Sequence, residues 1–156
     1  MQRLKDLRLH QNKRASSTGL SGFIPINSTN FDSIEVLSLN QNALTGGVDK
    51  DLGSKENLKE LWLANNLLGG SIPGELGNLS QLTTLRIEQN GMSGCYSSNL
   101  INLCGQLTNF NINGGNNNFD DNWVNFCTAP TYSGTCIDCS EIQVSWTGVI
   151  LSLIHI

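Results

Sequence analysis

The sequence predicts an α/β repeat solenoid, a fold in which short coils of chain stack side by side around one shared core. The first observation is a nine-residue pattern, Leu-x-x-Leu-x-Leu-x-x-Asn, that recurs along the chain. The second is its spacing: copies start at residues 4, 34, 58, 82 and 107, so three of the four intervals are 24 or 25 residues. The third is composition, because 38% apolar residues, 14% charged residues and 16 glycines suit many tight turns around an aliphatic interior.

Four copies of the pattern are clear and a fifth is degenerate. They run from Leu4 to Asn12, Ile34 to Asn42, Leu58 to Asn66, Leu82 to Asn90 and Leu107 to Gly115. Residues 13–18 add six residues after the first copy, and without them the first interval would also be 24 residues. In the fifth copy Gly115 replaces the final asparagine, which leaves the local register open. We predict repeats over residues 1–119.

The leucines of each copy are expected to point into the coil. A single coil cannot hide residues such as Leu58, Leu61 and Leu63 from water, so neighbouring coils must stack to bury them. The strand segments should then form a parallel sheet on the concave side of the solenoid. Looser stretches such as residues 74–82 should form short helical or extended turns on the convex side.

The asparagine that ends each clear copy is predicted to be structural. A short side-chain amide at a bend can donate to and accept from main-chain groups that would otherwise be buried without a partner. We expect these residues to form a ladder from coil to coil: Asn12, Asn42, Asn66 and Asn90.

Each asparagine is followed by Leu-x-Gly-x-Ile-Pro or a relative of it, as in residues 20–25 and 68–73. The complete phrase resembles the plant-type leucine-rich repeat, and the resemblance covers residues 1–119. It implies a right-handed coil with a concave parallel sheet. It also implies an extracellular protein, secreted or on the cell surface, similar to receptor-like ectodomains and polygalacturonase inhibitors.

All five cysteines lie in the last 62 residues, which indicates a stapled terminal cap. We predict this cap over residues 120–139, with disulfides joining Cys95 to Cys104 and Cys127 to Cys136 because each pair closes a short loop. Other pairings of these four cysteines stay open. Cys139 is left over, and the Cys-x-x-Cys that it forms has no second motif or nearby histidine to complete a metal site.

The two ends of the sequence are interpreted separately. The chain begins inside the periodic pattern, with no signal peptide, so we expect the true start to be missing. Residues 140–150 are expected to start a following segment, and residues 151–156 resemble the translation of a sequencing adaptor.

Two triplets in the repeat region are of the type that accepts N-linked glycans in secreted eukaryotic proteins: Asn27-Ser28-Thr29 and Asn78-Leu79-Ser80.

The residues between the inward leucines should face outward on the concave sheet, where a ligand could bind. The predicted contacts are Arg8, His10, Ser38, Asn40, Glu60, Trp62, Arg86, Glu88 and Asn111, and Asn113 shares the outward pattern. One residue from each strand should fall in a single column: Arg8, Ser38, Trp62, Arg86 and Asn111. Trp62 beside Arg86 combines an indole with a cation, the residue types that dominate binding hot spots.

These features predict recognition of a protein, peptide or polysaccharide ligand. The net charge of -4 gives no cationic surface for nucleic acid. We predict no enzyme activity, because Glu60 and Glu88 lie on an open surface and no nucleophile elbow or phosphate loop occurs. We also predict no cofactor and no metal.

Two other functions stay open at the level of sequence. The chain could be a structural or adhesive wall-associated protein without one selective ligand. It could also be the outer part of a membrane-spanning receptor-like kinase, in which case membrane association depends on sequence outside this chain. The apolar residues 144–150 are too few to cross a bilayer, which takes about 20 residues.

Overall fold

The computed structural model describes residues 4–10, 19–24 and 31–128. Three predictions fall outside these residues: the ladder position of Asn12, the triplet that begins at Asn27, and everything proposed for residues 129–156, including Cys136 and Cys139.

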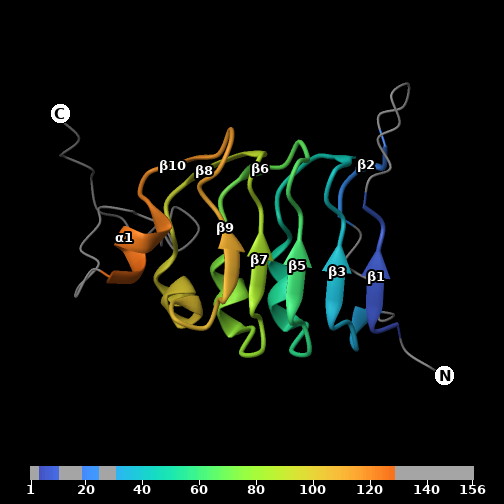
Figure 1. Cartoon of the computed structure of the whole chain (residues 1–156), viewed down its shortest axis with the longest axis horizontal. Coiled ribbons are helices and arrows are strands. Elements are labelled where there is room, and N and C mark those ends of the chain that lie inside the picture. The colour runs from blue at the N-terminus through green and yellow to red at the C-terminus, as the bar shows by residue number, and fades with distance from the viewer. Residues whose placement is uncertain (1–3, 11–18, 25–30, 129–156) are drawn as a thin grey trace, which may run out of the picture.

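The main sheet has five parallel strands, one from each repeat. They are β1 (Asp6–Arg8), β3 (Val36–Ser38), β5 (Glu60–Trp62), β7 (Thr84–Arg86) and β9 (Asn109–Asn111), hydrogen-bonded in that order. Figure 1 shows the five arrows side by side and pointing the same way. Their central residues pair directly from Leu7 to Leu37, Leu61, Leu85 and Phe110. The repeats predicted these strands because each copy places one inward apolar residue between two outward ones.

Two smaller parallel sheets lie after the ladder asparagines. One pairs β2 (Ser21–Gly22) with β4 (Ala43–Leu44), and the other orders β10 (Asn118–Phe119), β8 (Gly91–Gly94) and β6 (Gly69–Gly70). Sequence analysis did not predict these sheets, because glycine-rich dipeptides carry no strand propensity. Their pairing follows from the stacking of successive coils.

Among the described residues, the convex side carries the 3₁₀-helices η2 (Lys50–Ser54), η3 (Gly74–Asn78) and η4 (Ser98–Leu103), which pack in sequence against one another. A glycine makes each close contact possible. A Cβ on Gly53 would lie 2.3 Å from the carbonyl oxygen of Glu75, and one on Gly77 would lie 2.1 Å from that of Asn99. No larger residue fits there without separating the helices.

The core runs through all the coils, as the repeats predicted. The inward residues Leu58, Leu61, Leu63, Leu82 and Leu85 are completely buried. Each coil contributes a layer of leucines that only its neighbours cover, which makes the stack the unit of stability.

Asparagine side chains connect each coil to the previous one. Asn66 Nδ2 donates to the carbonyls of Leu39 (3.0 Å) and Leu63 (2.9 Å), and its Oδ1 accepts from the Leu44 amide (3.1 Å). Asn42 and Asn90 repeat this arrangement one coil earlier and one coil later.

The fifth copy continues the ladder at Asn117. Its Nδ2 donates to the carbonyls of Ile87 (2.9 Å) and Ile112 (2.8 Å), and its Oδ1 accepts from Met92 (3.2 Å). Gly115, which the repeat pattern assigned to this position, instead adopts a positive φ of 75°. The fifth coil therefore contains two extra residues before its ladder asparagine.

An aromatic cap closes the C-terminal end of the core. Tyr96, Trp123 and Phe126 are buried, and their ring centroids lie 5.1–5.4 Å apart. Trp123 and Phe126 belong to α1 (Trp123–Thr128), the only α-helix among the described residues. The cap therefore buries large rings where another layer of leucines would otherwise lie.

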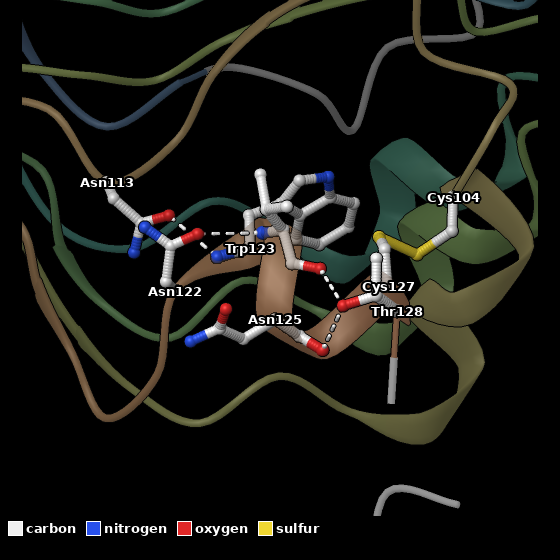
Figure 2. The surroundings of a disulfide bond; sticks show 8 residues. Cys104, Asn113, Asn122, Trp123, Asn125, Cys127 and Thr128 are labelled. Atoms are coloured by element: carbon white, nitrogen blue, oxygen red, sulfur yellow. Dashed lines mark hydrogen bonds between the residues drawn. A yellow bond between two sulfur atoms is a disulfide. The ribbon is translucent and has the colours of Figure 1, made fainter. Parts of the chain in front are cut away.

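The predicted pairings of Cys95 with Cys104 and of Cys127 with Cys136 are both wrong, because Cys104 and Cys127 bond to each other. Cys104, at the end of η4, forms a disulfide with Cys127 of α1, with a Cα–Cα distance of 5.4 Å. Figure 2 shows this bond joining α1 to the neighbouring coil. Cys95 has no disulfide partner among the described residues. The packing of α1 against Tyr96, rather than loop length, decides which cysteines meet.

Candidate functional site: the concave face

The predicted column of outward residues exists on the main sheet. The strand register pairs Arg8 with Ser38, Ser38 with Trp62, Trp62 with Arg86 and Arg86 with Asn111. Because neighbouring strands lie about 4.8 Å apart, these five positions span roughly 19 Å. We call this row the concave column.

Trp62 and Arg86 form the centre of the concave column. The guanidinium carbon of Arg86 lies 5.7 Å from the centroid of the Trp62 ring, within the range of a cation–π contact. The Trp62 indole Nε1 donates to Glu60 Oε2 at 2.9 Å on the same strand. Both side chains are half-buried, so part of each faces the solvent.

Glu88 holds the guanidinium of Arg86 in place. Arg86 Nη2 and Nε donate to Glu88 Oε1 at 2.5 and 3.1 Å, and Nη1 reaches Asn109 Oδ1 at 3.4 Å. The hydrogen bonds to Glu88 are the main reason that the pKa of Arg86 is raised. Glu88 itself is only 9% exposed, which makes it a support for Arg86 more than a contact surface.

The remaining predicted contacts differ in accessibility. His10 and Arg8 are exposed, and Arg8 pairs with Asp6 at 3.0 Å. Asn40 and Asn111 are half-buried. Ser38 is only 6% exposed and donates to Asn40 Oδ1 at 2.8 Å, so it presents little surface.

Asn113 does not belong to the concave face. Its Nδ2 donates to the Tyr96 hydroxyl at 2.8 Å and to the Asp121 carbonyl at 3.0 Å, and its Oδ1 accepts from the Trp123 amide at 2.9 Å. Figure 2 shows its side chain beside the start of α1. Asn113 therefore anchors the cap.

A charged row at the start of the strands was missed by sequence analysis. Glu35 lies between Lys5 and Lys59 and contacts each ammonium at 2.8 Å. Hydrogen bonds from these lysines, Lys5 first, lower the pKa of Glu35 to about 2. The signal was present in the sequence, because these residues share one repeat position and alternate in charge.

Three other kinds of site are relevant to the described residues: a metal site, an apolar cavity and a membrane-spanning helix. No group of three or more His, Cys, Asp or Glu residues could hold a metal ion there. An apolar cavity of about 230 Å³ lies at the first coils, lined by inward residues such as Leu7, Leu37 and Leu39, and does not include Trp62 or Arg86. Within residues 4–10, 19–24 and 31–128, no helix has the length and hydropathy needed to cross a bilayer.

Comparison with known proteins identifies the fold. The sequence model of the Leucine Rich Repeat family matches residues 57–79, which contain the third copy of the repeat. The five-strand register, the leucine core and the asparagine ladder extend that match over the neighbouring coils. The chain has the leucine-rich-repeat fold.

Several solved leucine-rich-repeat ectodomains are similar to this chain. That of the receptor kinase SOBIR1 from Arabidopsis thaliana is 26% identical, with a TM-score of 0.62 over 76% of this chain and 61% of its own. That of the plant membrane receptor kinase GASSHO1/SCHENGEN3 from Arabidopsis thaliana, in complex with CASPARIAN STRIP INTEGRITY FACTOR 2, is 28% identical, with a TM-score of 0.61 over 74% of this chain and 13% of its own.

The plant peptide hormone receptor RGFR1, in complex with RGF2, is 33% identical, with a TM-score of 0.55 over 64% of this chain and 16% of its own. This leucine-rich-repeat chain thus spans less than two thirds of each of these structures. No curated protein matches the sequence.

Proposed function

We propose that this chain is an extracellular recognition module that binds a protein or peptide along its concave column. The observation that carries the proposal is the Trp62–Arg86 pair at the centre of that column, each residue held by a neighbouring carboxylate. A ligand would meet an indole and a guanidinium that are already ordered. Binding therefore costs less side-chain entropy than it would with mobile residues.

The chemistry of the pair favours a peptide ligand. The exposed part of the indole offers apolar area, and the guanidinium can donate hydrogen bonds to main-chain carbonyls or to a carboxylate. A span of roughly 19 Å accommodates about six residues of extended peptide at about 3.3 Å per residue. In most interfaces a few central residues supply most of the binding free energy, and the contacts around them supply little. The Trp62–Arg86 pair has this central position in the concave column.

The similar structures support the same ligand class. RGFR1 is described as a plant peptide hormone receptor, and its structure contains RGF2. PEPR1, solved with AtPEP1, is 32% identical, with a TM-score of 0.57 over 64% of this chain. By analogy we place this chain outside the cell, either secreted or as the outer part of a membrane receptor.

The test begins with a ligand selection. The full chain, immobilised through its C-terminus, is used to select binders from a display library of random linear peptides. The affinity of each selected peptide is then measured by isothermal titration calorimetry. A recognition module should yield peptides with a shared sequence motif, whereas an adhesive protein would yield only weak binders without one.

Substitutions then locate the site. The double variant Trp62→Ala/Arg86→Ala should weaken binding at least 30-fold, because removal of a hot-spot residue costs about 2 kcal/mol or more. Lys50→Ala, on convex helix η2, is the matched control and should bind like the original chain. A selective peptide whose affinity survives the double substitution would show that binding occurs elsewhere.

A further inference from the structure

The triplet Asn78-Leu79-Ser80 lies at the end of the convex helix η3, in the part of the coil that does not belong to the strands of the concave column. Leu79 is fully buried, whereas Asn78 and Ser80 on either side of it are exposed. The Ser80 amide donates to the Asn78 carbonyl at 3.0 Å, and Leu79 has φ -80° and ψ 78°. These values describe an inverse γ-turn, which fixes the triplet on the surface by its buried central leucine.

The side-chain amide of Asn78 makes no hydrogen bond to any described residue. The equivalent position in the next coil is Asn102, which differs in two ways: its Nδ2 donates to the Gly77 carbonyl at 3.3 Å, and the residue two positions later is Cys104, which is in a disulfide. The equivalent residue in the preceding coil is Ser54, whose hydroxyl donates to the Asp51 carbonyl. Among these three positions, Asn78 alone combines an unused amide with a hydroxyl two residues later.

We infer that Asn78 is an N-glycosylation site. In this modification Asn78 Nδ2 attacks the anomeric carbon of an oligosaccharide linked to a lipid pyrophosphate. The new bond joins nitrogen to the sugar, the bond from the sugar to the pyrophosphate breaks, the lipid pyrophosphate leaves, and the amide nitrogen loses one proton. The inference rests on the extracellular location proposed above, because such triplets are modified in secreted proteins.

The folded coil accommodates this glycan without rearrangement. The side-chain amide of Asn78 makes no hydrogen bond between coils, unlike those of Asn66 and Asn102. Its modification therefore breaks no ladder or sheet hydrogen bond. A bulky polar group there would cover the convex ridge around η3. Protein partners would then be excluded from that ridge and directed to the concave face or the flanks, which agrees with a site centred on Trp62 and Arg86.

The experiment supplies the targeting signal itself, so its result is independent of where the chain naturally resides and of what it binds. The full chain is fused to a cleavable signal peptide and translated with endoplasmic-reticulum microsomes. Asn27→Gln is included in every variant, so that the other triplet cannot contribute. Modification is read as a shift in electrophoretic mobility that peptide N-glycosidase reverses, with conversion of the Asn78 side chain to a carboxylate detected by mass spectrometry.

The inference predicts a distinct result for each variant. The Asn27→Gln chain should carry one glycan, at Asn78. Adding Ser80→Ala should abolish it, whereas Ser80→Thr should retain it because threonine preserves the acceptor triplet. Asn102→Gln, at the equivalent position of the next coil, should not change modification. An unmodified Asn78 in the Asn27→Gln chain, in microsomes that glycosylate a control substrate, would overturn the inference, and the assay requires no folding.

Discussion

Replacing Asn66 by alanine tests the physical role of the ladder directly. The Leu44 amide loses its only hydrogen-bond partner among the described residues. The carbonyls of Leu39 and Leu63 each keep one donor, because Asn42 and Asn90 also bond to them. The main penalty is therefore one unsatisfied buried N–H, which costs about 1–3 kcal/mol, together with two weakened carbonyl contacts. We expect a loss of about 2–4 kcal/mol in the free energy of unfolding.

Asn66→Asp separates hydrogen bonding from side-chain shape. An ionised carboxylate still accepts from the Leu44 amide but faces the carbonyl oxygens of Leu39 and Leu63 without a proton to donate. Burial beside these oxygens raises the pKa of the introduced acid above its unfolded value of about 3.9. The loss in the free energy of unfolding caused by Asn66→Asp should therefore be smallest at low pH and should grow as the pH rises above about 4.

Urea denaturation followed by circular dichroism measures both effects. Asn57→Ala is the control, because Asn57 is exposed and makes one long hydrogen bond of 3.3 Å to the Asp32 carbonyl. It should change the free energy of unfolding by less than about 0.5 kcal/mol. If Asn66→Ala destabilised the chain as little as Asn57→Ala, the ladder would not be a source of stability.

Three further substitutions test other parts of the structure. Gly77→Ala should destabilise the chain by about 1–3 kcal/mol in urea, because the helices must separate, whereas Gly47→Ala, whose Cβ would lie 3.7 Å from its nearest neighbour, should not. Cys104→Ser/Cys127→Ser should lower the urea stability by about 2–4 kcal/mol, and an unchanged value would contradict a structural disulfide. Glu35 has a lowered pKa in the folded chain, so its contribution is present above pH 4.5 and lost as the pH falls through about 2. Melting temperatures of Glu35→Gln should therefore depend less on pH across this interval, and an unaltered dependence would contradict the ion-pair assignment.

The strands and the core could be predicted from the sequence because one constraint determines both. Residues such as Leu61 and Leu85 must be buried at a fixed repeat position, and this requirement sets the strand, its register and the outward position of its neighbours. The concave column follows from the same alternation. The exposure of individual residues does not follow from it, because the burial of Ser38 and Glu88 depends on particular neighbours: Trp62 lies opposite Ser38, and Arg86 bonds to Glu88.

The cysteine pairing could not be predicted from loop length. Closing a longer loop costs little, since each doubling of length adds only about 0.6 kcal/mol. The packing of Trp123 and Phe126 around Tyr96 outweighs a difference of that size and brings Cys127 to Cys104. These ring contacts join segments that no repeat pattern relates to each other.

The ladder position in the fifth copy was missed for a different reason. The repeat pattern implies a fixed length, whereas Gly115 adopts a left-handed conformation that lets the chain accommodate two extra residues before Asn117. A repeat pattern that permits a two-residue gap next to glycine assigns Asn117, within the run of asparagines at residues 116–118, to the ladder position.

The glycines between the 3₁₀-helices also influence the curvature of the molecule. An array bends when its outer arc lengthens more per coil than its inner arc, and the inner spacing is fixed by backbone pairing. Gly53 and Gly77 let the convex helices approach closely and so keep the outer arc short, which limits the bend between successive coils and the depth of the inner surface. A shallow surface of this kind lets an elongated molecule lie across several coils at once without being enclosed by them.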